Sequence, residues 1–442
     1  MANPGQTMSN SDFPDGILVG RAMVPGQAHP RVVTVRNGEL IDITAKGMAT
    51  VRDIAESVRA AEHVRTAPGT TLGSAAAVLA NSAAPVKDPK LPHLLSPIDL
   101  QAIKASGVTF VVSLLERVIE EQARGDKSRA DALRSEILDL IGMDLSELVP
   151  GSETAMKVKA ALIEKGVWSQ YLEVGIGPDA EIFTKGQPMS SVGYGAEVGL
   201  HPVSSWNNPE PEVALLVTSK GAIIGATLGN DVNLRDVEGR SALLLGKAKD
   251  NNASASLGPF VRLFDGDFTL ETVKQSEIAL RVEGDDGFVL EGHSSMSQIS
   301  RTPESLVAAT LGEHHQYPDG LVLYLGTMFA PVQDRGGVGM GFTHKLGDVV
   351  TISTSELGTL SNRVNLSTKC PPWTYGSSHL LRDLAKAEVI AVIDALMQRS
   401  PEAVEAEIVA PLQALAQKTD QQRRDETAAT RVDFFTMVRG DN

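Results

Sequence analysis

Three carboxylates lie close to two apolar runs in the middle of the chain. Glu210 and Glu212 stand one residue apart just before the first run, and Asp231 follows the second. Side chains at i and i+2 of a strand point to one face, so Glu210 and Glu212 are expected to project together. A carboxylate at the border of a core is costly unless it is paired or binds a metal. Oxygen ligands suit Mg²⁺, Ca²⁺ or Mn²⁺ better than zinc. The alternative is a solvated acidic turn, because the chain has 55 acidic residues.

Two lysines could complete such a site. Lys247 follows the apolar run Leu243–Leu245, and Lys185 ends the sequence Ile-Phe-Thr-Lys. A partly desolvated lysine beside a metal has a lowered pKa and can act as a base. Each lysine has an ordinary alternative as a surface residue at the end of a strand.

Two further pairs have spacing that suits chemistry. Ser113 and Glu116 are three residues apart and share one face of an expected helix, near its first turn. The same Ser-x-x-Glu spacing is a capping pattern. Gly326 and Thr327 end an apolar run and offer a backbone N–H and a hydroxyl to a carboxylate, or form an ordinary turn.

The elements that must position these residues are mostly strands. Short β-branched runs separated by Gly, Pro and Asp dominate from about 167 to 370, with few helical gaps. This pattern favours an α+β fold with a mixed or antiparallel β core over a doubly wound sheet. Asn37-Gly38 between two β-branched runs predicts a hairpin of residues 31–35 and 40–44. Residues 66–94 are rich in Ala, Pro, Gly and Ser and are expected to form a loop.

Helical periodicity marks the remaining segments. Helices are expected over 49–65, 111–141, 156–165, 378–397 and 401–419. We therefore predict three parts: a small N-terminal β subdomain with its linker over 1–95, a catalytic domain over 96–376 and a C-terminal helical extension over 377–442.

Composition excludes several classes of function. A net charge of −15 disfavours nucleic acid or an anionic membrane surface as a partner. No apolar run approaches the roughly 18 residues that a membrane span needs. The single cysteine, Cys370, allows no disulfide within the chain and fits a reducing cytosol, where it is expected to be a structural thiol rather than a nucleophile. The polar N-terminus has no signal-peptide pattern, so a cytoplasmic location is expected.

Eight motifs, taken in their order along the chain, resemble the fumarylacetoacetate hydrolase family. The resemblance covers about residues 105–366, and the segment Ile182–Lys185 is also similar to the family's approach to its site. The motifs are Glu210-x-Glu212 with its apolar strand, Gly229-Asn-Asp231 with Asp236, Leu245-Gly-Lys247, Leu257-Gly-Pro259, Ser294-Ser-Met296, Leu325-Gly-Thr327, Leu346-Gly-Asp348 and Leu357-Gly358 with Asn362.

The resemblance implies a β-roll core of mixed strands around a metal site. Glu210, Glu212 and Asp231 would hold Mg²⁺ or Mn²⁺, which would chelate the carboxylate and 2-oxo oxygen of a small 2-oxo acid. Lys247 would be the active-site lysine. The substrate would be bound by Thr327, Gly326, Lys185 and Thr109.

One departure from the family pattern limits which type of reaction is expected. Hydrolytic members carry a His–Glu pair that activates water, whereas this chain has Ser113 in place of that histidine and keeps Glu116. This form of the pattern, from Gly107 to Glu116, resembles the branch of 2-keto-3-deoxy sugar-acid dehydratases, and so do residues 312–320. The implied reaction removes a proton from C3 of a 2-keto-3-deoxypentonate and expels the C4 hydroxyl, giving 2,5-dioxopentanoate. Lys247 or Glu116 would be the base, Glu116 could protonate the leaving hydroxyl, and Ser113 would belong to the catalytic group.

Two alternatives remain at this stage. One is a hydrolase or decarboxylase that cleaves a C–C bond of a 2,4-dioxo acid such as an acylpyruvate. The other is a non-catalytic binding scaffold, which the retained carboxylates disfavour. A homodimer or higher homo-oligomer is expected, and the C-terminal extension is either an oligomer contact or a lid.

Overall fold

A computed structural model describes residues 13–110, 148–164, 166, 169–329, 331, 333–337 and 341–416. The chain divides into two compact units, Met1–Ser377 and Ser378–Asn442, which are described separately. The predicted helix over 111–141 lies outside the described residues.

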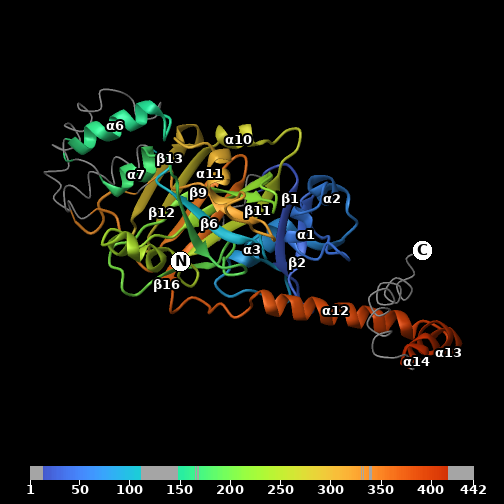
Figure 1. Cartoon of the computed structure of the whole chain (residues 1–442). Coiled ribbons are helices and arrows are strands. Elements are labelled where there is room, and N and C mark those ends of the chain that lie inside the picture. The colour runs from blue at the N-terminus through green and yellow to red at the C-terminus, as the bar shows by residue number, and fades with distance from the viewer. Residues whose placement is uncertain are drawn as a thin grey trace. The chain divides into compact units, whose positions relative to one another are not determined.

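The first unit contains a large mixed sheet of eleven strands (Figure 1). Ten strands follow the order β4-β3-β2-β1-β11-β10-β9-β14-β6-β7, and β5 pairs with β1. Neighbours are antiparallel except β14 and β6, which run parallel. The strands are β1 (Leu18–Met23), β2 (Arg31–Arg36), β3 (Glu39–Asp42), β4 (Thr70–Ser74), β5 (His93–Leu94), β6 (Ala102–Gly107), β7 (Glu181–Gly186), β9 (Pro211–Val217), β10 (Ile223–Asp231), β11 (Ala255–Leu263) and β14 (Leu321–Tyr324).

A second sheet of five strands packs against the first. Its order is β13-β12-β15-β16-β8, formed by Val289–Ser295, Glu277–Glu283, Val349–Thr354, Gly358–Leu366 and Glu197–Leu200 respectively. One core cluster takes residues from both sheets, among them Leu228 and Phe260 from the first and Leu280 and Leu360 from the second. Ser256 also donates a hydrogen bond of 2.8 Å from β11 to Asn362 on β16. The mixed β core predicted from the sequence is therefore confirmed.

Helices surround these sheets in the first unit. They are α1 (Val51–Ala55), α2 (Ala60–Thr66), α3 (Ala75–Ala83), α6 (Glu153–Glu164), α7 (Gln170–Ile176), α8 (Arg235–Glu238), α9 (Leu245–Lys249), α10 (Leu270–Lys274) and α11 (Pro303–Thr310), with 3₁₀ turns η3 (Ala242–Leu244) and η4 (Met296–Gln298). Figure 1 shows α1 and α2 beside β1 and β2, where Val51 and Ile54 join a core cluster with Val19 and Val32. A capping box between Thr50 and Asp53 begins α1.

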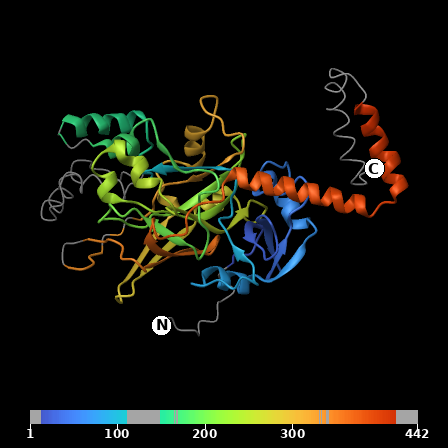
Figure 2. The ribbon, with the colours of Figure 1, turned by 90° about the horizontal axis from the view of Figure 1, so that it is seen from below.

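The described part of the second unit, up to residue 416, is helical. Figure 2 shows α12 (Ser377–Met397) as one unbroken helix, and shorter segments follow it: α13 (Pro401–Val404), the π-helical turn η5 (Glu405–Val409) and α14 (Ala410–Ala416). The helical periodicity predicted for 378–397 and 401–419 agrees with these elements within the described range.

The N-terminal region agrees with the sequence prediction in part. The predicted hairpin forms as β2 and β3, with Asn37 and Gly38 at positive φ of 52° and 76°. The expected loop over 66–94 was wrong, because it contains β4 and α3. Alanine has the highest helix propensity, and the alanine run 75–77 begins α3. β1 pairs with β11, so these strands continue the main sheet, and the division at residue 95 stays a prediction.

Candidate active site

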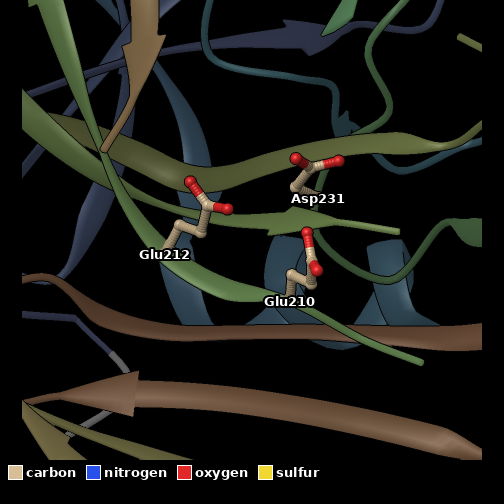
Figure 3. A group of neighbouring side chains, drawn as sticks. All are labelled: Glu210, Glu212 and Asp231. Atoms are coloured by element: carbon tan, nitrogen blue, oxygen red, sulfur yellow. The ribbon is translucent and has the colours of Figure 1, made fainter. Parts of the chain in front are cut away.

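The three carboxylates meet at the ends of two central strands of the large sheet, where β9 begins and β10 ends. Glu210 directly precedes β9, Glu212 lies on it, and Asp231 is the last residue of the neighbouring β10. The register pairs Glu212 with Gly229, and the Asp231 N–H donates to the Glu210 carbonyl at 3.0 Å. One carboxylate oxygen of each lies within 4.8 Å of the others, and Figure 3 shows the three groups turned toward one another. All three side chains are buried.

Charge repulsion inside this cluster favours a bound cation. Burial, reinforced by the negative charges of Asp231 and Glu210, raises the pKa of Glu212 well above its ordinary value. The Gly326 N–H donates to Glu212 Oε2 at 2.8 Å and opposes that shift. Three converging, buried carboxylates are the donor set of a hard divalent ion such as Mg²⁺ or Mn²⁺.

Lys249 contacts the triad, whereas Lys247 does not reach it. Lys249 is 3% exposed, and its Nζ donates to Glu210 Oε2 and to Asp231 Oδ2, the latter at 3.2 Å. Lys247 lies exposed on the same helix, α9. Two residues rotate a helix by about 200°, so the two side chains leave on opposite sides. The sequence carried no signal to choose between them, because the choice depends on the orientation of α9.

Lys185 lies behind the triad and is fully buried. Its Nζ is 2.9 Å from Asp231 Oδ1, and it donates to the carbonyls of Lys249 at 2.5 Å and Val232 at 3.2 Å. A further bond of 3.3 Å reaches Ser254 Oγ. Burial lowers the pKa of Lys185, and the charge of Asp231 opposes that shift. With these acceptors around its ammonium group, Lys185 holds protein groups beside the triad, and the substrate contact predicted from the sequence stays a prediction.

A small polar pocket opens in front of the triad. It is lined by the three carboxylates, Lys249, Ser106, Gly107, Val108, Glu181, Phe183, Glu238 and Thr327. A Cβ at Gly107 would lie 1.8 Å from Glu181 Oε2, so only glycine lets this carboxylate approach. Sequence reasoning missed Glu181, although it directly precedes the Ile182–Lys185 motif.

Glu238 is tied to the triad through an amide. Asn233 Nδ2 donates to Glu238 at 2.6 Å and to Glu210 Oε1 at 3.1 Å. Glu181 and Glu238 also line a larger cavity of about 480 Å³, with Gln170, Tyr171 and Leu245 among its other walls. The small pocket and the larger cavity therefore share Glu181 and Glu238 as walls.

The remaining predicted site residues fall into three groups. Thr327 lines the pocket, and its hydroxyl donates to the Phe329 carbonyl at 3.0 Å. Thr109 is buried and donates to the Leu325 carbonyl at 2.5 Å, so its hydroxyl supports the Gly326 turn. Ser113 and Glu116 lie outside the described residues. Cys370, which was expected to be structural, is 4% exposed, and burial raises the pKa of its thiol to about 11.

Two family models match the chain. "Fumarylacetoacetate (FAA) hydrolase C-terminal" matches residues 153–365, and "Phosphonate metabolism protein PhnG" matches residues 332–440. The second match covers the C-terminal helices, for which the sequence analysis proposed no relative. None of the helices in the described part of the chain combines the length and apolar character that crossing a bilayer requires.

Two relatives with assigned names match parts of the chain. A "Probable 2-keto-3-deoxyxylonate dehydratase" of Haloferax volcanii is 27% identical over 335 residues, which is 76% of this chain and 95% of the relative. A "2-dehydro-3-deoxy-D-arabinonate dehydratase" of Saccharolobus solfataricus is 30% identical over 41% of this chain and 57% of the relative.

A solved structure shares the fold. "2-keto-3-deoxy-D-arabinonate dehydratase complexed with magnesium and 2,5-dioxopentanoate" superposes with a TM-score of 0.55 and 20% identity, covering 79% of this chain and 99% of that one. This confirms the predicted architecture of the core. Over residues 153–365 the chain matches the fumarylacetoacetate hydrolase model, in agreement with the resemblance found in the sequence.

Proposed function

We propose that this protein is a Mg²⁺-dependent dehydratase (a hydro-lyase) of a 2-keto-3-deoxy sugar acid in sugar-acid catabolism. The substrate would be a 2-keto-3-deoxypentonate and the product 2,5-dioxopentanoate. The observation that carries the proposal is the buried triad with Lys249 and Glu181 at its open side. The name of the Haloferax volcanii relative, of which the chain covers 95%, supports this choice.

Glu210, Glu212 and Asp231 would hold the cation. Burial and the neighbouring carboxylates raise the pKa of Glu212, and a divalent ion, either Mg²⁺ or Mn²⁺, would offset that repulsion. The bound ion supplies Lewis-acid polarisation of the substrate's 2-oxo group, which makes the C3 proton more acidic.

Lys249 and Glu181 are the proposed proton-transfer groups. Lys249 lies against Glu210 and Asp231, and Glu181 lines the same pocket. One removes the C3 proton and the other protonates the departing C4 hydroxyl, so one water leaves and a C3–C4 double bond forms. Tautomerisation then moves one proton from C5 and one from its hydroxyl to C3 and C4, which gives the 5-aldehyde of 2,5-dioxopentanoate. A positioned acid or base of this kind contributes roughly 10²–10⁴-fold to a rate. The Thr327 hydroxyl and Gly326, at the end of β14, would face the substrate carboxylate.

The test is turnover of each 2-keto-3-deoxypentonate stereoisomer by the purified protein, with Mg²⁺ and after chelation. We expect Mg²⁺-dependent formation of 2,5-dioxopentanoate from at least one isomer, with strong loss in Glu181→Gln. Absence of product from every isomer would reject the proposal. Acylpyruvates run in parallel would reveal C–C bond cleavage, the alternative reaction.

Further properties stay predictions. The proposed partner is a small 2-oxo acid, which the pocket could hold only with a bound cation, because its carboxylates repel an anion. A homodimer or higher homo-oligomer is expected, which light scattering can check. The cytoplasmic location expected from the single cysteine can be checked by cell fractionation.

A further inference from the structure

Residues Ile299–Arg301 form a short connection between η4 and α11, which we call the strap. The strap contacts two segments that are distant in sequence, the end of β6 and the stretch from α7 to β7. Both segments contribute walls of the triad pocket: Gly107 and Val108 come from the first, and Glu181 from the second. The strap takes no direct part in the proposed proton transfer.

The first side of the strap fixes the end of β6. Phe110 and Ile299 form an isolated β-bridge. The backbone N–H and the hydroxyl of Ser300 both donate to the Thr109 carbonyl, at 2.8 and 2.9 Å. Thr109 in turn donates to the Leu325 carbonyl at 2.5 Å, and the next N–H, that of Gly326, donates to Glu212. A continuous set of hydrogen bonds therefore joins the strap to a triad carboxylate.

The second side depends on Arg301, which is 7% exposed. Its guanidinium donates to the carbonyls of Val174 at 2.8 Å, Gly177 at 2.7 Å and Asp179 at 3.1 Å. These carbonyls span the end of α7 and the approach to β7, and Asp179 lies two residues before Glu181. A planar guanidinium has several fixed donors, so one side chain can hold three carbonyls at once. Its positive charge also suits the C-terminal end of a helix.

We propose that the strap is a positioning element, with Arg301 as its main residue, that aligns Glu181 with the triad. This inference rests on the proposed function for the role of Glu181 in proton transfer. Arg301 acts through the backbone at 174–179 and Ser300 acts through Thr109. Alignment of this kind matters because a displacement of about 1 Å can cost about 10²-fold in rate.

The test uses Arg301→Ala and Arg301→Lys in the full chain, with Arg281→Ala as the matched control. Arg281 is an exposed arginine that pairs with Glu283 and Glu291 on the second sheet. In Arg301→Ala we expect kcat to fall roughly 10–100-fold, while the Mg²⁺ Kd from calorimetry stays within about twofold, because β9 and β10 keep their register. The kcat of Arg301→Lys should lie between that of the wild type and that of Arg301→Ala, since one ammonium group cannot hold three carbonyls.

Rescue separates positioning from a general loss of structure. Guanidinium ion at millimolar concentration, well below denaturing levels, should restore part of the kcat of Arg301→Ala and leave Arg281→Ala unchanged. If Arg301→Ala does not fold, Ser300→Ala and Arg301→Lys replace it, and a lowered kcat with retained Mg²⁺ affinity is again expected. Unchanged kcat, or a loss of kcat that only accompanies lost Mg²⁺ affinity, would overturn the proposal.

Hydrogen exchange tests the strap without turnover. Amides of residues 174–181 and 107–110 should exchange faster in Arg301→Ala than in the wild type, with β9 and β10 unchanged. If the wild type dehydrates no substrate but this local change appears, the proposed function fails while the structural action of the strap holds. Equal exchange in both proteins would refute the strap even where dehydratase activity is found.

Discussion

Exchanging the two lysines of α9 for methionine, one at a time, tests the site most directly. Lys249 contacts Glu210 and Asp231 and is buried, whereas Lys247 is exposed. The sequence motif pointed to Lys247 and the structure points to Lys249. The two substitutions remove the same group from positions two residues apart, so each is the control for the other.

The structure sets the expected size of the effect on stability. Lys249→Met leaves two buried carboxylates without the cation that contacts both, and removing one partner of a buried pair typically costs about 3–5 kcal/mol. Proton uptake by the triad limits this loss, so we expect about 3 kcal/mol for the metal-free protein near pH 7. Lys247→Met should change the free energy of unfolding by no more than about 0.5 kcal/mol, as for most surface substitutions.

Turnover should separate the two variants further. Loss of a proton-transfer group lowers kcat by roughly 10²–10⁴-fold, so Lys249→Met should retain little activity and Lys247→Met should match the wild type. Bound Mg²⁺ would restore part of the stability, by about 2.7 kcal/mol at 100 times its Kd, but not the activity.

The assay combines denaturant unfolding, with EDTA and with Mg²⁺, and kcat for 2,5-dioxopentanoate formation. The reasoning fails if Lys249→Met keeps wild-type stability and turnover. It also fails if Lys247→Met alone loses activity, because the motif would then have been the better guide.

Three other predictions follow, two for the surroundings of the triad and one for Cys370. Lys185→Met should destabilise the protein by about 3–5 kcal/mol, far more than Lys104→Met on the neighbouring β6; a raised KM with unchanged unfolding would instead favour the substrate contact predicted from the sequence. Gly229→Ala should cost roughly 1–3 kcal/mol through overpacking, because a Cβ there would lie 2.3 Å from Tyr324 Cε1; Gly266→Ala, with no atom within 4 Å, is the control, and equal melting temperatures would contradict this. Cys370 should react slowly with iodoacetamide at pH 8 in the folded protein and quickly when unfolded. Its folded pKa of about 11 exceeds the unfolded value of about 8.5, so its contribution to stability is complete below pH 8.5 and is lost as pH rises through 11; rapid alkylation of folded protein at pH 8 would refute the burial argument.

Periodicity predicted the part of the site that lies on single strands. Glu210 and Glu212 share a face because the side-chain period of a strand is two. The turn and apolar run between them and Asp231 indicated a neighbouring strand. The hairpin at Asn37-Gly38 was predictable for a similar reason, because its turn chemistry is local.

Contacts between elements that are distant in the sequence produce no such periodicity, so they could not be predicted. The choice of Lys249 over Lys247 depends on how α9 faces the sheet, and the place of Lys185 depends on the path of its side chain behind Asp231. Arg301 binds main-chain carbonyls, which every residue has, so no side-chain motif marks its partners. The helix α3 was missed because the Pro, Gly and Ser residues around the alanine run 75–77 favour a loop, although alanine itself favours a helix.

The site lies at one end of several neighbouring strands of the large sheet, and this has a consequence for how the substrate range can change. Five neighbouring strands place most of the pocket wall there: β10 and β9 carry the triad, β14 leads to Thr327, β6 ends at Gly107, and β7 begins with Glu181, while Lys249 comes from α9. The connection from β10 to β11, residues 232–254, belongs to the site itself, because Asn233 and Lys249 both contact Glu210. Substitutions at Gln170 and Tyr171, which line the larger cavity from α7, should instead alter which sugar acid is accepted while the ion-binding chemistry persists, so engineering of the substrate range should begin at that wall.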